Sequence, residues 1–520
     1  MKIIKKQYTF LWILFAVLVV SGCGGPVSPS GDSSDTSSKK IAGTIPANAV
    51  SNALPYNLEF EEQNYSGNTP LPRLQSYVAA TASSGELLII GGRRQGLHTF
   101  QAAPAKNFIP DSSNNYLFVI DPKTGNSWSF DVNKLPANLA APLQSTNQQS
   151  YHDLASDQLY LVGGYGWNAD QSDMLTFNTM ISFKVDVLVA LIKGAQPAQK
   201  IADAMQFAQD DRLAVTGGEL FKMGGKFYLV FGQKFTGQYR AFGGTDFKQQ
   251  YTEEFRVFTL MPNTLKILSY GASTNKDAGQ PFHRRDGNII EDIDPATGRT
   301  RIAAFGGVFK PGIIGAYTTP VYITGPGMSV VDSSVEQKFS QYECPVIPVY
   351  DSTNTPTMYH SFFGGIGHYY YNQTPSQKAA YDTVSAEGRN DGFPFVEDIT
   401  TFLQTADGNY KEYIHTNQTP GNRLVGSSVR FIINRGLYNN NLAYPNGVIQ
   451  LANFSNNSKQ LVGYIYGGVE AQNPLPLRPN TGTFVSNSLF AVYLTRTPTA
   501  AIPASEGHES VVQDANLQRR

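Results

Sequence analysis

The sequence has little charge, almost no cysteine and little tryptophan. Charged residues make up 16% of the 520 residues, the formal net charge is -1, and there are two cysteines and three tryptophans. A protein that binds nucleic acid or an acidic membrane surface by electrostatic attraction needs clustered Lys and Arg. The sparse, balanced charge therefore argues against nucleic acid as a partner.

The common catalytic and cofactor motifs are also missing. The chain contains no G-x-x-x-x-G-K-[ST], H-E-x-x-H, C-x-x-C or G-x-S-x-G. These absences remove the usual sequence arguments for a phosphate-binding loop, a zinc protease, a thiol oxidoreductase and a hydrolase nucleophile. The acidic stretches "EDIDPATG" and "YDSTN" lack the ligand spacing of a calcium loop and are predicted to be hairpin turns. No cofactor and no metal ion is predicted.

The first residues present an export signal. A basic segment, "MKIIKKQ", precedes the apolar run "YTFLWILFAVLVV", which is too short for a comfortable membrane span. The stretch that ends at Cys23, "VSGC", resembles the lipobox of bacterial lipoproteins, in which the signal peptidase cuts before the cysteine and its thiol carries a diacylglycerol. This resemblance implies a signal peptide at residues 1–22 and a lipid on Cys23. Gly24 resembles the outer-membrane sorting pattern and implies an outer-membrane lipoprotein of the bacterial cell envelope, facing the periplasm or the cell surface.

Two segments of the mature chain are predicted to lack fixed structure. Residues 23–55 contain "GGPVSPSGDSSDTSSKK", which is too poor in apolar residues to fold and suits a flexible tether. Residues 498–520 have no strand pattern and are expected to form a loose tail. Once Cys23 carries a lipid, Cys344 is the single remaining thiol, so residues 56–497 are expected to be stabilised by packing and not by a disulfide.

Six apolar runs that close on glycine recur between these ends, which indicates an internal repeat. They are "LLIIGG" (Gly91, Gly92), "LYLVGG" (Gly163, Gly164), "FYLVFGQ" (Gly232, with Gln233 as the departure from the pattern), "IAAFGG" (Gly306, Gly307), "SFFGG" (Gly364, Gly365) and "GYIYGG" (Gly467, Gly468). Each run follows a turn and an earlier extended segment, so each unit is predicted to be a hairpin. In the last unit, "VIQLANFSNNSKQLVGYIYGG", the earlier extended segment is "VIQL". The glycines are interpreted as structural, because crowded strand ends and positive φ angles both favour glycine.

Further apolar segments predict outer strands and a circular fold. They are residues 117–130, 181–192 and 255–268 and the strand that follows Ser488. Four strands per unit and six units predict an all-β fold, a six-bladed β-propeller of four-stranded antiparallel blades. Residues 56–63, "YNLEFEEQ", are expected to complete the last blade. The glycine-ended runs, together with Trp128 after "IDPKTG", resemble the kelch-repeat family from Leu58 to Arg496, which implies a kelch-like propeller.

Strand direction predicts which face of the propeller carries a binding site. In an antiparallel blade, the start of the innermost strand and the segment after the glycine pair lie on one face. The candidate ligand-binding residues on this face are Arg73, Glu219, His283, Arg284, Arg285 and Glu343 at strand starts and Trp167 and Tyr369 after glycine pairs. They predict a polar funnel with an aromatic rim, suited to a sugar ring or an extended peptide. Alternatively, Arg73, Arg285, Glu219 and Glu343 simply pair with one another.

These observations favour a lipid-anchored recognition module for a glycan or a peptide, with no catalytic residue assigned. Residues 368–398, an insertion with the segment "SQKAAYDTVSAEGRNDG", are predicted to contain a short helix or lid. The kelch resemblance leaves two enzymatic alternatives open. One is a sugar mutarotase, whose proton transfer needs a positioned carboxylate. The other is a copper enzyme similar to galactose oxidase, with ligands from the Tyr-His pairs at 151–152 and 359–360 and a crosslink to Cys344.

Overall fold

The computed structural model describes the chain from Leu54 to Thr497 with interior gaps. The described residues are 54–65, 70–99, 101, 103–239, 246–312, 315–367, 393–415, 417–474 and 482–497. The chain divides into two units, residues 1–40 and 41–520, and every described residue lies in the second. The signal peptide, Cys23, almost all of the tether, the tail 498–520, Tyr369 and most of the 368–398 insertion are outside the described residues. None of the helices within these ranges is long and apolar enough to cross a membrane.

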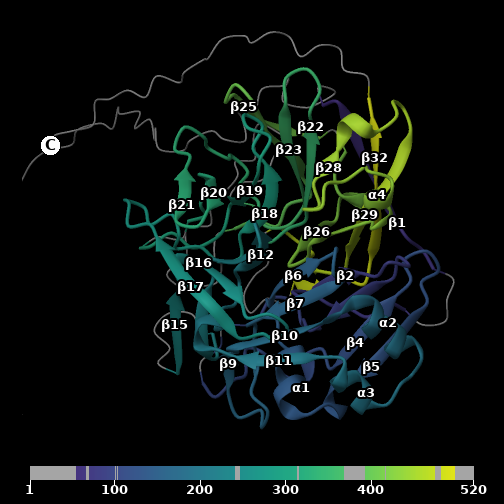
Figure 1. Cartoon of the computed structure of the whole chain (residues 1–520), viewed down its shortest axis with the longest axis vertical. Coiled ribbons are helices and arrows are strands. Elements are labelled where there is room, and N and C mark those ends of the chain that lie inside the picture. Colours follow the sequence, from purple (N-terminus) through teal and green to yellow (C-terminus); the bar gives the residue numbers. More distant parts are fainter. Residues whose placement is uncertain are drawn as a thin grey trace, which may run out of the picture. The chain divides into compact units, whose positions relative to one another are not determined.

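In the part of the chain that the structure describes, six sheets form the blades, and each contains four antiparallel strands, written here from the innermost outward; the sheet of blade 5 has one strand more, β28, described below (Figure 1). Blade 1 is β2 (Val78–Thr81), β3 (Leu87–Ile90), β4 (Tyr116–Ile120) and β5 (Ser127–Asp131); blade 2 is β6 (Gln149–Asp153), β7 (Gln158–Val162), β10 (Thr179–Lys184) and β11 (Gln206–Gln209); blade 3 is β12 (Glu219–Met223), β13 (Lys226–Val230), β16 (Glu254–Leu260) and β17 (Ile267–Thr274); blade 4 is β18 (Asn288–Ile293), β19 (Thr300–Phe305), β20 (Val321–Gly325) and β21 (Met328–Val331); blade 5 is β22 (Val346–Asp351), β23 (Thr357–Phe363), β24 (Ile399–Thr405) and β25 (Tyr410–Ile414); blade 6 is β27 (Phe431–Ile433), β29 (Lys459–Tyr466), β32 (Leu489–Arg496) and β1 (Tyr56–Glu62). The prediction of an all-β propeller with four-stranded blades is confirmed.

The last blade takes its outermost strand from the beginning of the described chain. β1 pairs antiparallel with β32, with Tyr56 opposite Arg496 and Glu62 opposite Phe490. Leu58 lies opposite Leu494, and both side chains are fully buried. The prediction that residues 56–63 complete the blade built by the C-terminal strands is therefore confirmed.

One residue per blade, placed just before the inner strand, has a left-handed backbone and joins the blades at the axis. These hub residues are Ser76, Asn147, Gly217, Asp286, Glu343 and Ser428. Their φ angles range from 48° at Asn147 to 67° at Gly217. Backbone N–H to carbonyl bonds connect Ser76 to Ser428, Asn147 to Ser76, Gly217 to Asn147, Asp286 to Gly217 and Ser428 to Glu343, at 2.7 to 3.3 Å. The five bonds link all six blades in one series whose ends are Asp286 and Glu343.

The glycine pairs have the structural role that the sequence predicts. Gly163 has φ of 65°, and a Cβ built there lies 2.1 Å from the carbonyl oxygen of Val215, in the next blade. The amide of Gly164 donates a 2.8 Å hydrogen bond to that same carbonyl. In blade 3 the prediction that Gln233 is the residue that departs from the Gly-Gly pattern was wrong. Phe231, with φ of 57°, occupies the position of the first glycine, and Gly232 is the second.

Two predicted strands were assigned incorrectly. Residues 181–192 begin as a strand but continue as α2 (Val185–Lys193), which buries Val185, Leu188, Val189 and Ile192 on one side. That i, i+3, i+4, i+7 spacing is helical.

The segment "VIQL" was also misassigned as the inner strand of blade 6. Its residues form β28 (Ile449–Gln450), which adds to blade 5 as a parallel strand beside β22. The inner strand of blade 6 is β27, whose three residues are too few to reveal an alternating pattern.

Within the described residues, segments that leave the glycine pairs take part in two additional sheets. One contains β8 (Tyr165–Trp167), β9 (Met174–Thr176), β14 (Gln233–Gly237) and β15 (Phe247–Tyr251), and the other contains β26 (Leu424–Ser427), β30 (Val469–Ala471) and β31 (Thr483–Val485). Single β-bridges tie the residue before the hub to the residue after the glycine pair, as in Thr146 with Tyr165 and Arg285 with Val308. Strand starts and post-glycine segments therefore share one face, as predicted.

The hydrophobic core lies between neighbouring blades. One cluster combines Leu88 and Val119 of blade 1 with Leu161 and Phe183 of blade 2 and with Leu188 of α2. The remaining helices, α1 (Ala137–Leu143), α3 (Ala198–Asp203) and α4 (Gly436–Asn439), are short. The sheets thus form a rigid support for the side chains at the axis.

Candidate functional site

The inner strands and the hub residues line two chambers along the axis. A cavity of about 300 Å³, here called the inner-strand chamber, is lined by β2, β6, β12, β18, β22 and β27. A cavity of about 150 Å³, the glycine-side chamber, is lined by residues before the hub and after the glycine pairs. A constriction of about 40 Å³ contains all six hub residues and shares lining residues with both chambers. The hub therefore separates two sites with different linings.

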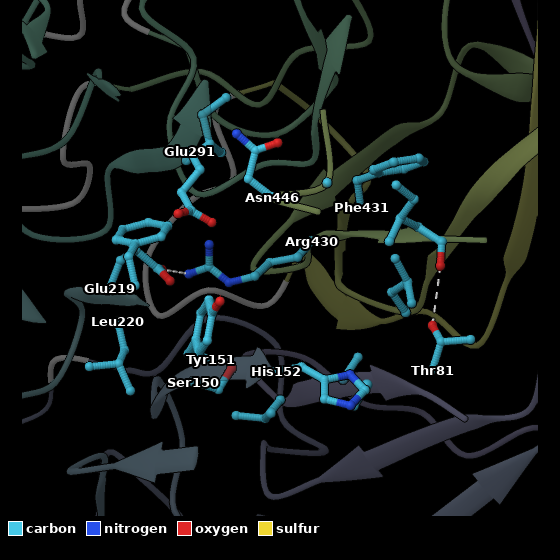
Figure 2. A pocket seen from close by; sticks show the side chains of 18 of the residues that line it. Thr81, Ser150, Tyr151, His152, Glu219, Leu220, Glu291, Arg430, Phe431 and Asn446 are labelled. Carbon is cyan, nitrogen blue, oxygen red and sulfur yellow. Dashed lines mark hydrogen bonds and ion pairs between the residues drawn. The ribbon is translucent and has the colours of Figure 1, made fainter. Parts of the chain in front are cut away.

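An ion pair crosses the inner-strand chamber. Glu219 begins β12 in blade 3 and is buried, and its Oε1 pairs with Nη2 of Arg430, the residue before β27 in blade 6. The side chain of Arg430 is 55% exposed because it extends into the cavity. Figure 2 shows its guanidinium in the middle of the chamber, with the carboxyl groups of Glu219 and Glu291 on one side and Tyr151 below it.

Glu291 is a carboxyl group without a bonding partner among the described residues. It lies in β18, lines the inner-strand chamber and makes no hydrogen bond or ion pair with any part of the chain that the structure describes. Burial raises the pKa of the Glu291 carboxyl to about 8. At neutral pH the group is therefore mostly protonated, and it offers both a hydrogen-bond donor and an acceptor to the chamber.

Two tyrosines flank this carboxyl. Tyr151 of β6 and Tyr438 of α4 line the chamber, and the negative charge of Glu291 contributes to raising the pKa of both phenols, after the larger effect of burial. Neither hydroxyl has a hydrogen-bond partner within the described ranges. Three polar groups without internal partners thus face one cavity, and such groups are normally satisfied in a folded protein.

The connection between β27 and β29 closes one end of this chamber. It supplies Tyr438 together with Pro445, Asn446 and Gly447. Arg435 holds this connection to blade 2 by an ion pair of 3.1 Å with Asp157. This part of the site has no signal in the sequence, because nothing there shows that the connection lines a cavity together with the inner strands of the other blades.

The glycine-side chamber has charged groups at its hub end. Arg285 donates from Nη1 to Oδ2 of Asp286 at 3.0 Å and from Nε to the Tyr251 hydroxyl at 3.1 Å. Burial raises the pKa of Glu343 to about 8, and the neighbouring charge of Asp286 adds to this effect. Burial also raises the pKa of Asp286, while Arg285 opposes that rise.

Aromatic side chains form much of the wall of the same chamber. They are Phe108, Tyr165, Phe235, Tyr239, Phe309 and Tyr342. Tyr165 packs against both Phe108 and Phe235, with ring centroids 5.3 and 5.4 Å apart. A chamber with polar and aromatic lining therefore lies on the predicted face, and its aromatic residues are not the ones named from the sequence, Trp167 and Tyr369.

Of the eight residues predicted to bind a ligand, three lie at the axis. Arg285 and Glu343 line the glycine-side chamber, and Glu219 lines the inner-strand chamber and the constriction. The predicted pairing of Arg73, Arg285, Glu219 and Glu343 with one another is wrong. Glu219 pairs with Arg430, Arg285 pairs with Asp286, and Arg73 donates to the carbonyl of Val485.

The other predicted residues that the structure describes, Arg73, His283, Arg284 and Trp167, line neither chamber. His283 stacks on Tyr251 and places Nδ1 2.6 Å from Glu253. Arg284 is 1% exposed and donates to the carbonyls of Pro281, Gly306 and Thr319, which gives it a structural role.

Trp167 is buried, with Lys106 over its ring, and Tyr369 lies outside the described residues. Four residues that line the inner-strand chamber, Tyr151, Glu291, Arg430 and Tyr438, were not among the predicted binding residues. An isolated Glu or Arg in a strand gives no sequence signal of this kind.

The residues considered for a copper site lie in other surroundings. His152 is 3.4 Å from Asp157, and His360 is 3.2 Å from Asp292. Cys344 is buried, accepts a 3.3 Å hydrogen bond from Asn288, and has a pKa that burial raises to about 12. Across the described ranges, no three His, Cys, Asp or Glu side chains are grouped as metal ligands.

Comparison with known proteins gives similarity to solved structures and none to a family model or a curated protein. No family model and no curated protein matches the sequence. Among solved structures, the chain is similar to the one titled "Structure of YjhT", with 12% sequence identity and a TM-score of 0.40, over 80% of this chain and 99% of that chain.

Proposed function

We propose that the protein is a lipid-anchored recognition protein of the bacterial cell envelope, and that its kelch-like propeller holds a sugar unit of a glycan in the inner-strand chamber. The observation that carries the binding role is the convergence of Tyr151, Glu291 and Tyr438, none with a hydrogen-bond partner within the described chain, on a cavity of about 300 Å³. The lipobox, with Cys23, and the tether at residues 23–55 support the anchored location.

The chemistry of the chamber favours a neutral, hydroxyl-rich ligand. The charges of Glu219 and Arg430 offset each other, and Glu291 is mostly uncharged at neutral pH. A ligand with several hydroxyl groups satisfies donors and acceptors at once, and the rings of Tyr151 and Tyr438 provide surfaces on which a sugar ring stacks. A volume of about 300 Å³ is at the lower limit for small-molecule pockets, which agrees with one sugar unit.

The test is binding of the full-length protein, in a detergent without a sugar head group, to a glycan array, followed by calorimetry on the glycans retained. Glu291→Gln and Tyr151→Phe are compared with Glu59→Gln, which alters a surface glutamate paired with Lys459. We expect each chamber variant to weaken binding about three- to tenfold, as loss of one hydrogen bond does, and the surface variant to bind as the wild type does. Equal binding by all three variants would falsify the assignment of this chamber.

A second candidate function is conversion of the bound sugar, as the mutarotase alternative implies. The observation in its favour is that Glu291 is mostly protonated at neutral pH and faces the chamber, as a general acid must. Exchange of sugar anomers measured by NMR tests it. An enzyme loses turnover in Glu291→Gln while some binding remains, whereas a recognition protein shows no exchange above the uncatalysed rate in either form.

A further inference from the structure

Arg93 is a buried charge in the wall of the glycine-side chamber. It follows the first glycine pair, its residue is 3% exposed, and it lines the chamber. Nη2 donates to the Gln95 side chain at 2.9 Å and to the Ile109 carbonyl at 3.3 Å, and the guanidinium lies 4.7 Å from the centre of the Phe108 ring. Within the described ranges, no carboxylate pairs with Arg93, and no acceptor is bonded to its Nε or Nη1.

The other deeply buried arginines are compensated in other ways. Arg301 makes a two-pronged pair with Asp292, at 2.9 and 3.1 Å. Arg284 donates to three backbone carbonyls and lines neither chamber. A buried guanidinium without a counterion is costly unless hydrogen bonds or a ligand compensate it. Arg93 therefore differs from both, because its unused donors belong to a side chain that faces a cavity.

The charged side chains that line the glycine-side chamber also favour a negatively charged ligand. Apart from His98 and the tyrosines, its ionisable lining consists of Arg93, Arg285, Asp286 and Glu343. Because Glu343 has a pKa of about 8, it is mostly uncharged at neutral pH. The uncharged form of Glu343 leaves Asp286, which pairs with Arg285, as the carboxylate opposed to two guanidinium groups, so the lining favours an anion.

The remaining lining limits the size and the character of a ligand. The volume of about 150 Å³ is about half the lower limit for a drug-sized pocket. Tyr165 and Phe235 present aromatic surfaces, and Leu97, Val308 and Ile366 add aliphatic ones. A small molecule with one anionic end and an apolar body is complementary to this combination.

We propose that the glycine-side chamber is a second binding site, and that it takes a small organic monocarboxylate whose carboxylate binds Arg93 while its apolar body packs against Tyr165 and Phe235. Arg93 has donors free to bind a carboxylate in the two-pronged geometry that guanidinium groups favour. The site is separate from the inner-strand chamber, so this proposal does not depend on the proposed glycan.

Three probes of similar shape and different charge test the proposal on the full-length wild-type protein in detergent. Isothermal titration with benzoate, benzamide and benzylamine separates the anionic, neutral and cationic forms of one ring. We expect benzoate to bind at least tenfold more tightly than either of the others. Equal binding of benzamide shows that the charge is not recognised, and preferred binding of benzylamine shows that Asp286 and Glu343 dominate the chamber; either result overturns the proposal.

Variants then identify the residue that binds the carboxylate. Arg93→Gln is expected to lower benzoate affinity at least tenfold. The matched control is Arg94→Gln, because Arg94 is exposed, donates to the Asp111 carbonyl and does not line the chamber. Circular dichroism checks folding. If Arg93→Gln does not fold, Arg93→Lys is used in its place and is also expected to lower benzoate affinity.

Glu291→Gln serves as a second control, because it alters the other chamber and is expected to leave benzoate binding unchanged. Retention of full benzoate affinity by a folded Arg93 variant contradicts the assignment to Arg93.

Discussion

The backbone amide of Ser76 donates a 2.7 Å hydrogen bond to the carbonyl of Ser428. Ser76 precedes the inner strand of blade 1 and Ser428 precedes that of blade 6, so this bond joins the first and last blades at the axis. The circle is also closed near the rim, where β1, the first described strand, completes the sheet of blade 6 beside β32 before the chain continues to blade 1. The circle is thus closed at both its inner and outer edges, and the chambers at the axis depend on that closure.

The outer closure is predicted to depend on Leu58. Its side chain is fully buried opposite Leu494, and Leu58→Ala removes packing between the first and last strands. We expect a loss of about 2–5 kcal/mol in the free energy of unfolding, as for other buried leucines. Asn57→Ala, at the exposed neighbouring position, is the control and is expected to change stability by less than about 0.5 kcal/mol. Denaturant unfolding of the two variants measures the difference, and equal midpoints contradict a stabilising role for β1.

The blade-to-blade contact of the glycine pairs is tested by two glycines with similar φ angles. Gly163 and Gly298 have φ of 65° and 67°, but a Cβ on Gly163 lies 2.1 Å from a carbonyl whereas one on Gly298 has no atom within 4 Å. We expect Gly298→Ala to cost about 1–2 kcal/mol from the left-handed backbone alone. Gly163→Ala is expected to cost more, because the blades must also move apart. Thermal unfolding compares the two, and an equal loss shows that backbone conformation alone explains these glycines.

The raised pKa of Glu291 predicts a pH dependence of stability. In the unfolded chain this carboxyl loses its proton near its ordinary pKa of 4.5, whereas in the folded protein it keeps the proton up to about 8. The folded state therefore binds more protons between these values, and the contribution of Glu291 to stability falls as the pH rises from about 5 to 8. The contribution of Glu291 to stability changes little below pH 5 or above pH 8.

Glu291→Gln removes this titration and isolates its effect. We expect the melting temperature of the wild type, measured relative to Glu291→Gln at each pH, to decrease from pH 5 to pH 8 and then to level off. The control is Glu59→Gln, which alters a surface ion pair, and its melting temperature is expected to change with pH as that of the wild type does. A constant difference between the wild type and Glu291→Gln across this range contradicts the raised pKa.

The proposed lipid anchor predicts the behaviour of Cys23→Ser. The variant lacks the thiol on which we propose the diacylglycerol is carried, so most of the protein is expected to leave the membrane fraction, because stable anchoring requires acyl chains. Detergent phase partitioning and immunoblotting of cell fractions measure the shift. Cys344→Ser, at the remaining cysteine, is the control and is expected to stay with the membrane. Unchanged membrane association of Cys23→Ser refutes the lipobox assignment.

The fold was predictable because its requirements are local. A strand that ends in Gly163-Gly164 must turn sharply beside the next blade, and this requirement appears in the sequence as a glycine pair at the end of an apolar run. The errors arose where local patterns are ambiguous. Residues 185–193 are apolar enough to suggest a strand but have helical spacing, and β27 has three residues, too few to show a period.

The sites were predictable only in part, because they combine residues from distant blades. Arg285 and Glu343 were found from their positions at strand starts, which the repeat defines. The pairing of Glu219 with Arg430, which joins blades 3 and 6, depends on side-chain directions across the axis. Arg93 stood among several charged residues after a glycine pair, and its burial without a counterion has no signature in the sequence.

The sequence by itself determined the repeat, the four-stranded blades and the strand that closes the circle, because each depends on the order of residues within a short segment. Tertiary structure alone decided which polar groups meet at the axis and which remain unpaired there. Tyr151, Glu291 and Tyr438 come from β6, β18 and α4, and they share one chamber only after the circle has closed and the connection after β27 has folded over its end. Burial and charge pairing, which give these groups their chemistry, are properties of that closed arrangement.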